Sequence, residues 1–392
     1  MKIAINGAGV AGPTLAWWLK KYGYEPVIFE KASALREGGY VIDFWGTGYD
    51  IAEKMGLLPE LKEKGYFIET LSLLNKEGKR TSDINVKTLA SVVNGRFLSI
   101  RRSDLAATIY NSCHGIEVRF GEHIVDMEQD NKRAQVTLSN GKQEEFDLVI
   151  GADGLHSHIR SKVFGSTEKY EKDLGAYVVA FTLSDYQPRD ELTYMVCPVA
   201  TKQVARFSLR DNKTLFLFTF RSELVTGIPK NKEDAKEILN NIFADMQWQE
   251  VNKALSQIDE VDDFYFDHVS QIHMGSWSKG RVALIGDAAA CASLLAGEGS
   301  GLAMIESYVL AGELYKAKGN YELAFKNYED KLKSFLQKKQ KTATSNLYLF
   351  APRNNFQVNI AKLMLKVSNI PVLSKVLLRS MLKDRIKLPE YD

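Results

Sequence analysis

The sequence predicts an α/β protein with a parallel sheet flanked by helices, a second, mainly antiparallel sheet, and helices towards the C-terminal end. Three stretches of the 392 residues indicate the parallel sheet. Each is a short apolar segment that runs into small residues, at positions 2–12, 146–154 and 282–303. Such segments are typical of buried strands, and open α/β sheets bind ligands where their parallel strands end.

The composition argues against several classes of protein. Apolar residues make up 45% and charged residues 26% of the chain, and the net charge of +2 gives no field that would attract nucleic acid. The three cysteines and six histidines show no spacing typical of a disulfide framework or a metal site. No stretch approaches the ~20 uncharged apolar residues of a membrane span, and the chain opens on a strand rather than a signal peptide. We expect a cytoplasmic monomer that binds no metal, nucleic acid or membrane.

The first stretch carries the spacing of a dinucleotide-binding turn. After the expected strand KIAIN, three glycines follow the pattern GxGxxG: Gly7, Gly9 and Gly12. The first permits a tight turn, the second lets the backbone approach a pyrophosphate, and the third lets helix and strand pack closely. Glu30 ends the next expected strand, 26–30, where a carboxylate can accept both ribose hydroxyls. This motif alone does not distinguish FAD from NAD.

The second stretch favours a flavoprotein. Residues 146–150 form an expected buried strand that enters the turn GADG, which contains Asp153. The preceding segment alternates apolar and polar residues and contains the dipeptide Asn140-Gly141, which predicts a β-hairpin. A β-meander that leads into the last parallel strand suits a flavin-binding Rossmann-like domain better than a plain dehydrogenase.

The third stretch consists mostly of small side chains. From Gly286 to Ala303, thirteen of eighteen residues are Gly, Ala, Ser or Cys. Asp287 follows the expected strand 282–285 and can accept a hydrogen bond from a flavin ribityl hydroxyl. The small residues allow the backbone to approach a flat ring, and a helix begins in the segment GEGSGLA. We interpret this stretch as the wall beside an isoalloxazine.

Together the motifs GAGVAG…FE, GADGLHSHIR and GDAAACASLLAGEGSGLA resemble those of the FAD-dependent aromatic hydroxylases, the group A flavoprotein monooxygenases. The segments 262–289 and 308–329 are most similar to the tetracycline destructases within that family. The chain departs from the family pattern at three positions, with Leu294 for proline, Glu298 for glutamine and Gly301 for asparagine.

The motifs and the resemblance together imply a set of cofactor-binding residues. The FAD candidates are Gly7, Gly9, Ala11, Gly12, Glu30, Lys31, Arg36, Gly39, Asp43, Arg102, Asp153, Gly286, Asp287, Gly297, Gly299 and Ser300. For Arg36 and Arg102, a solvated surface charge is the alternative. The backbone of Ala296, Gly297 and Gly299 is the candidate for stabilising the reacting flavin, and no general base can be named. Phe181, Phe216 and Phe218 are candidates for substrate contact or for the core.

The resemblance also implies the reaction. NADPH or NADH, bound transiently, reduces FAD, and O2 forms a flavin C4a-hydroperoxide that hydroxylates an electron-rich aromatic or polyketide substrate such as a tetracycline. Two alternatives remain open. One is a hydroxylase of another phenolic or quinone-like metabolite, and the other is a flavin-binding protein without oxygenase activity.

The expected domains are discontinuous. Residues 1–70, 98–168 and 273–340 form the FAD-binding domain, and 71–97 and 169–272 form the substrate-binding domain. Residues 341–392 are expected to form bridging C-terminal helices, divided at Pro371. Seven Lys or Arg between positions 362 and 387 leave open a basic amphipathic helix on a membrane surface.

Overall fold

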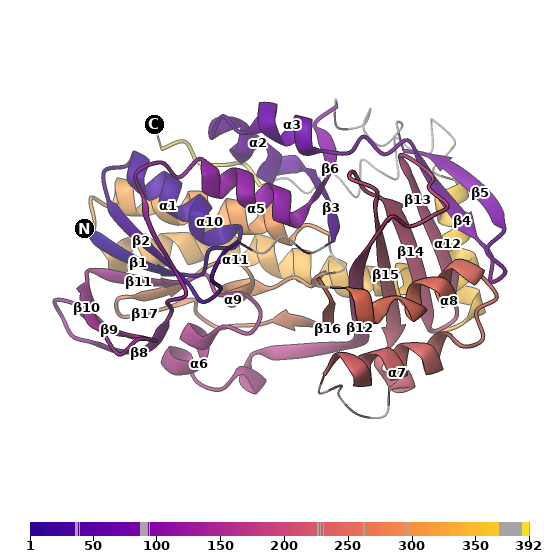
Figure 1. Ribbon diagram of the computed structural model, residues 1–392. Coiled ribbons are helices and arrows are strands. Elements are labelled where there is room, and N and C mark those ends of the chain that lie inside the picture. The colour runs from indigo at the N-terminus through magenta and orange to yellow at the C-terminus, as the bar shows by residue number, and fades with distance from the viewer. Residues whose placement is uncertain are drawn as a thin grey trace.

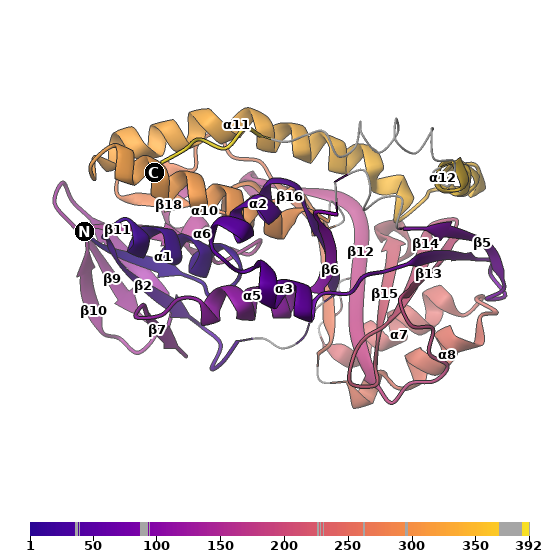
Figure 2. The ribbon, with the colours of Figure 1, turned by 90° about the horizontal axis from the view of Figure 1, so that it is seen from above.

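The computed structural model describes residues 1–35, 38, 40–86, 93, 95–225, 227, 229, 231–261, 263–294, 297–367 and 386–391. Two large sheets form the two halves of the protein (Figure 1). A long helix, α11 (Tyr321–Asn346), runs along the first half towards the second, as the view from above shows (Figure 2).

The first half contains a six-stranded sheet in the order β17-β18-β11-β1-β2-β7. All neighbouring strands are parallel except β17 and β18. The strands are β1 (Lys2–Asn6), β2 (Glu25–Glu30), β7 (Glu117–Phe120), β11 (Leu148–Gly151), β17 (Ser278–Lys279) and β18 (Val282–Leu284). Their near-continuous burial is that of a sheet covered on both faces.

Helices cover one face of this sheet and a small sheet covers the other (Figure 1). The helices are α1 (Ala11–Lys21), α5 (Arg102–Asn111) and α10 (Gly299–Lys316). The small sheet is a three-stranded meander of β8 (Ile124–Gln129), β9 (Ala134–Leu138) and β10 (Gln143–Phe146), followed after β11 by α6 (His158–Phe164). Phe146 of the meander meets Phe29 of β2 edge to face, with ring centroids 5.9 Å apart.

The second half contains a seven-stranded sheet in the order β16-β12-β15-β14-β13-β4-β5, in which only β4 and β13 pair in parallel. The strands are β4 (Thr70–Leu74), β5 (Arg80–Asn85), β12 (Glu171–Ser184), β13 (Thr193–Val199), β14 (Lys202–Ser208), β15 (Lys213–Arg221) and β16 (Tyr265–Ile272). Two helices cover one face: α7 (Lys232–Phe243) and α8 (Gln249–Ser256). Short 3₁₀ turns occur at Thr167–Lys169, Ser222–Leu224, Ile258–Glu260 and Leu347–Leu349.

Three phenylalanines considered as substrate contacts lie in the core beneath α7 and α8. Phe181, Phe216 and Phe218 are at most 1% exposed and stack on one another, and Phe218 also meets Phe243 of α7. Side chains alternate between the two faces of a strand, so the neighbouring positions Leu215 and Leu217 face the other half of the protein. This placement removes the three rings from the candidate substrate site.

The remaining elements connect the two halves. A two-stranded sheet of β3 (Val41–Trp45) and β6 (Phe97–Arg101) stands between the large sheets (Figures 1 and 2). The helices α2 (Gly46–Lys54), α3 (Leu58–Lys64) and α9 (Asp287–Ala290) belong to the first half. After α11, α12 (Asn355–Val367) packs beside β5 and β13 of the second half. The predicted division of the tail at Pro371 lies outside the described residues.

Residues 386–391 return to the first half. The hydroxyl group of Tyr391 donates to Glu313 of α10 at 2.7 Å, and Tyr308 donates to the carbonyl oxygen of Pro389 at 2.9 Å. The Tyr391 ring packs so closely over Gly312 that a Cβ there would overlap it. Thus α12 contacts the second half and residues 386–391 contact the first.

Helices α2 and α10 cross at two glycines, and the crossing requires glycine at position 48, whereas a Cβ on Gly301 would only reach ordinary contact, 3.8 Å from the Cα of Gly48. A Cβ on Gly48 would lie 2.5 Å from the Cα of Gly301. We expect Gly48→Ala to lower the free energy of unfolding by about 1–3 kcal/mol, because overpacking outweighs the gain in helix propensity. Gly275→Ala is the matched control, since its Cβ would meet nothing within 4 Å. Equal denaturant midpoints for the two variants would contradict the close crossing.

The fold class predicted from the sequence is confirmed: a parallel sheet with helices, an antiparallel sheet domain, and C-terminal helices. Within the described part of the chain, no helix is both long and apolar enough to cross a bilayer. Nor do the described residues contain a group of three or more His, Cys, Asp or Glu suited to a metal ion.

Candidate functional site

The first glycine-rich turn combines close packing with open space. Gly7 has a φ of +118°, and a Cβ there would overlap the carbonyl oxygen of Ala152. A Cβ on Gly12 would overlap the carbonyl oxygen of Gly7, so this position fixes helix α1 against the turn. A Cβ on Gly9, in contrast, would meet nothing within 4 Å. The space at Gly9 faces the N-terminal end of α1, where the first N–H groups have no partner within the helix.

Glu30 holds the same turn from the end of β2. Its two carboxylate oxygens accept hydrogen bonds from the backbone N–H groups of Ala8, at 2.8 Å, and Ala32, at 2.9 Å. The half-buried carboxylate therefore lies at the edge of the open space and retains lone pairs for ribose hydroxyls. Of the two neighbouring FAD candidates, Ala11 is buried within α1, whereas Lys31 is exposed.

Asp153 organises the GADG turn. Its carboxylate accepts from the Ser157 hydroxyl at 2.5 Å, from the N–H of His158 at 2.9 Å and from Asn6 of β1 at 3.2 Å. Arg160 is fully buried and donates to the carbonyl oxygens of Leu155, at 2.6 Å, and Ala288, at 3.1 Å. This arginine ties the GADG turn to the turn that contains Asp287.

A buried carboxyl group supports the turn before Asp287. Gly286, with a φ of +62°, donates its N–H to Glu306 at 2.8 Å, and the Tyr328 hydroxyl group lies 3.0 Å from the same oxygen. Glu306 is 1% exposed, and burial raises its pKa well above the ordinary value. Glu306 was not predicted from the sequence, although an acidic residue inside the apolar run AMIESYVLA indicates a buried carboxyl group.

Two buried glutamines hold the chain that follows α9. Gln271 donates to the carbonyl oxygens of Ala292, at 2.9 Å, and Gln340, at 2.7 Å. Gln340 donates in turn to Ile272, at 2.7 Å, and Cys291, at 3.1 Å. Nothing in the sequence marks Gln271, but Gln340 interrupts the buried stripe of α11 and could have been found.

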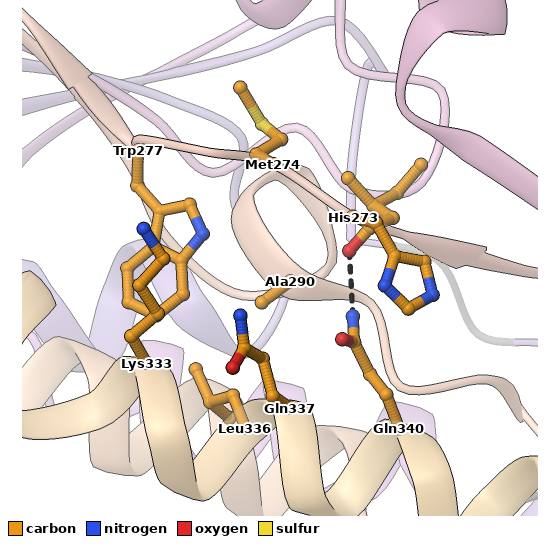
Figure 3. A pocket seen from close by; sticks show the side chains of 9 residues that line it. His273, Met274, Trp277, Ala290, Lys333, Leu336, Gln337 and Gln340 are labelled. Atoms are coloured by element: carbon orange, nitrogen blue, oxygen red, sulfur yellow. Dashed lines mark hydrogen bonds between the residues drawn. The ribbon is translucent and has the colours of Figure 1, made fainter.

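A small pocket lies between this region and α11. Figure 3 shows Trp277, His273 and Ala290 opposite Lys333 and Gln337 of the helix. Its volume is about 40 Å³, enough for one or two water molecules and far below the ~300 Å³ of a small-molecule site. The pocket therefore is not the place for a flavin or its substrate.

The departures from the family pattern have local partners. Leu294 packs against the apolar cluster that includes Leu347 and Val178. Glu298, at the start of α10, forms an ion pair with Lys339 of α11 at 2.5 Å. Gly297 and Ser300, on either side of Glu298 in the sequence, are half-buried.

The FAD candidates Arg36 and Gly39, and Ala296, the candidate for stabilising the reacting flavin, lie outside the described residues.

Several polar side chains meet between the two halves of the protein. We call this region the central recess, formed by Tyr40, Asp43, Arg102, Tyr194, Tyr265 and Asp287. Tyr40 raises the pKa of Arg102 most, burial opposes the rise, and Asp287 adds to it. These electrostatic couplings place Arg102, Tyr40 and Asp287 near one another. Burial raises the pKa of Tyr40 to about 12, with Asp287 and Asp267 contributing.

Asp43 opens on the same recess from β3. The side chain is exposed, but burial raises its pKa, while a 2.6 Å hydrogen bond from the Ser99 hydroxyl opposes the rise. Burial raises the pKa of Tyr194 of β13, and the Asp43 carboxylate raises it further. This coupling shows that the two side chains lie near each other. The ring of Tyr265 lies 6.2 Å from that of Tyr40. The first half thus contributes the carboxylates, Arg102 and Tyr40 to the recess, and the seven-stranded sheet contributes Tyr194 and Tyr265.

A charged network borders the recess and was not predicted. Asp267 of β16 accepts from Tyr265 at 3.3 Å and lies 3.0 Å from His156 and 3.2 Å from His268. His268 also lies 2.7 Å from Glu171. Although burial opposes ionisation of Asp267, the two histidines hold its pKa below the usual range.

This network predicts a pH dependence of stability. Hydrogen bonding to Asp267, followed by Glu171, raises the pKa of His268 from 6.5 to about 9. A raised pKa stabilises the folded state fully below the unfolded value, so this contribution is lost as the pH rises from 6.5 through 9. We expect the free energy of unfolding to fall more steeply over this interval in the wild type than in His268→Gln. Parallel curves from urea titrations would contradict the pairing.

The residues present fit FAD. The open space at Gly9, the Glu30 carboxylate and the start of α1 match a pyrophosphate and an adenosine ribose. The small-residue turn at Asp287 lies at the end of β18 in the same sheet, where a ribityl chain and a flat ring can approach. These positions come from widely separated parts of the sequence, and the parallel sheet brings them to one edge.

Comparisons with known proteins agree with this assignment. A family model described as "FAD binding domain" matches residues 1–337. A flavin-dependent monooxygenase from an unknown prokaryotic organism is 37% identical over 341 residues, covering 87% of each chain. Another, from Legionella longbeachae serogroup 1 (strain NSW150), is 35% identical over 344 residues and 87% of each chain. The chain therefore belongs to the FAD-binding-domain family and is a flavin-dependent monooxygenase.

Solved structures give the same architecture. The structure of tetracycline destructase Tet(51) is 30% identical, with a TM-score of 0.85, and covers 100% of this chain and 99% of its own. That of tetracycline destructase Tet(55) is 29% identical, with a TM-score of 0.86 and coverages of 100% and 98%. A Klebsiella pneumoniae HpxO structure, with FAD and uric acid, shares the fold at 19% identity and a TM-score of 0.81.

Proposed function

We propose that this monooxygenase oxygenates a flat, electron-rich polyketide of the tetracycline type and so inactivates it. The observation that carries the proposal is the full-length likeness to two tetracycline destructases, which includes the second sheet as well as the FAD-binding half. The tyrosines of the central recess support it, since aromatic rings pack well against a flat polycyclic substrate.

The chain's own residues bind and position the reactants. FAD, when bound, supplies the activation of O2 and the transfer of one oxygen atom. Gly9, Glu30 and Asp287 would hold the cofactor along the edge of the six-stranded sheet. Tyr40 and Tyr265 would orient the substrate beside it, and the seven-stranded sheet would exclude water from the recess.

The test is an assay of the holoenzyme with tetracycline, NADPH and O2. We expect loss of the long-wavelength absorbance of tetracycline and incorporation of one oxygen atom from labelled O2. Uric acid and a 3-hydroxypyridine carboxylate serve as comparison substrates in the same assay. Turnover of either one without tetracycline loss would contradict the proposed substrate and leave the monooxygenase assignment in place.

A further inference from the structure

Asp43, one of the FAD candidates from the sequence, lies in β3 near Tyr194 of the second half. In β3, Ile42 and Phe44 face the core of the first half, where Phe44 packs against Tyr49 of α2. Asp43 alternates with them and therefore points to the opposite side, into the central recess. No cation among the described residues contributes to its pKa.

The carboxylate is held at one oxygen and open at the other. Ser99 lies directly across from Asp43 in the β3–β6 pair, is fully buried, and donates to Oδ1 at 2.6 Å. Asp43 is exposed as a residue, and no described residue donates a hydrogen bond to Oδ2. Because Ser99 holds Oδ1, Oδ2 is the oxygen that remains available to a group entering the recess.

The groups that face Asp43 come from two other strands. From β6 they are Ser99 and Arg101, and the guanidinium of Arg101 is engaged by Asp104 at 2.8 Å. From β13 the facing group is Tyr194, whose ring lies 6.0 Å from that of Phe207. The helices that pack on β3 do so on its other face. Asp43 thus stands opposite Tyr194 of the second half.

We propose that Asp43 is the general base of the reaction and accepts the proton of an ionisable phenol or enol hydroxyl group on the substrate. The substrate O–H bond breaks, its electron pair stays on the substrate oxygen, and the proton moves to Oδ2 while Ser99 keeps its bond to Oδ1. The resulting oxyanion makes the ring richer in electrons, which favours attack by an electrophilic oxygen. Burial supports this role by keeping the pKa of Asp43 above its ordinary value, nearer to that of such hydroxyl groups. This inference rests on the proposed function.

The test compares the wild-type holoenzyme with Asp43→Asn, Asp43→Glu and a matched control, Asp83→Asn. Asp83 also accepts from a buried serine directly across a strand pair, Ser72, at 2.5 Å, but it lies on the edge strand β5. FAD affinity, measured by flavin fluorescence, is recorded for every variant. Tetracycline oxygenation is measured from pH 5 to 9.

We expect wild-type oxygenation to fall as the pH drops through the pKa of Asp43. Asp43→Asn should lose about 10²–10³-fold in rate at neutral pH and recover as the substrate ionises by itself at higher pH. Asp43→Glu should keep part of the rate, and Asp83→Asn should match the wild type. An unchanged pH profile in Asp43→Asn, or a loss of FAD in place of a loss in rate, would overturn the proposal.

A second readout separates this inference from the proposed substrate. 4-Nitrophenol, whose phenolate is coloured, is titrated into the oxidised holoenzyme below the pH at which it ionises in solution. We expect a phenolate band in the wild type that is absent in Asp43→Asn, whether or not tetracycline is a substrate. A band of equal intensity in both, or in neither, would contradict proton transfer to Asp43.

Discussion

Gly9→Val is expected to abolish retention of FAD while leaving the apoprotein as stable as the wild type. A Cβ at this position meets no atom of the chain within 4 Å, and the backbone there does not adopt a positive φ. The added side chain would instead fill the space where we expect the pyrophosphate. We expect at least ~100-fold weaker FAD binding, because the phosphates lose contact with the N–H groups of the turn and of α1.

Gly275→Val is the matched control for this substitution. Its Cβ is equally unobstructed and its backbone equally free of a positive φ, but it lies outside the glycine-rich turn. Both variants should show the wild-type melting temperature without cofactor, and only Gly9→Val should purify colourless. Normal flavin content in Gly9→Val would mean that the open space is not the pyrophosphate site.

Asp287→Ala is expected to weaken FAD binding by ~10- to 100-fold, which corresponds to about 1–3 kcal/mol for one unpaired hydrogen-bond donor. The half-buried carboxylate begins α9, and its Oδ1 lies 3.8 Å from where a Cβ on Gly299 would stand. It thus occupies the gap between the two small-residue segments. The measurement is a titration of apoprotein with FAD followed by fluorescence.

Asp234→Ala controls for the loss of an acidic side chain from the first turn of a helix. Asp234 lies in the first turn of α7, on the far side of the seven-stranded sheet. If both variants lose equal affinity, the effect is one of general stability. If Asp287→Ala binds FAD normally, Asp287 does not contact the cofactor.

The glycine spacings and the strand ends could be predicted from the sequence because local rules determine them. Gly7 and Gly12 follow from how closely a strand, a turn and a helix can pack, and each is a position where a Cβ would overlap the backbone. Asp287 follows from its place after a buried strand. Long-range folding was not needed for these predictions.

The other half of the site depends on contacts between distant segments. Asp43 and Tyr194 are about 150 positions apart, and no pattern in either strand indicates that they meet. The alternation of side chains in β15 predicted two faces of the strand but not which face α7 and α8 would cover. For this reason the face that carries the phenylalanines was considered as a substrate contact. Gln271 could not be found because the carbonyl oxygens to which it donates belong to segments that are remote in sequence.

The order of strands in the six-stranded sheet has a consequence for synthesis on the ribosome. β18, at 282–284, lies beside β11, at 148–151, and every strand of the seven-stranded sheet is translated before it. The contiguous segment 171–272 can fold as it emerges from the ribosome. During that time the edge of β11 that pairs with β18 has no partner strand. Because the FAD candidates Gly299 and Ser300 lie at the start of α10, we expect uptake of the flavin to follow translation of this helix.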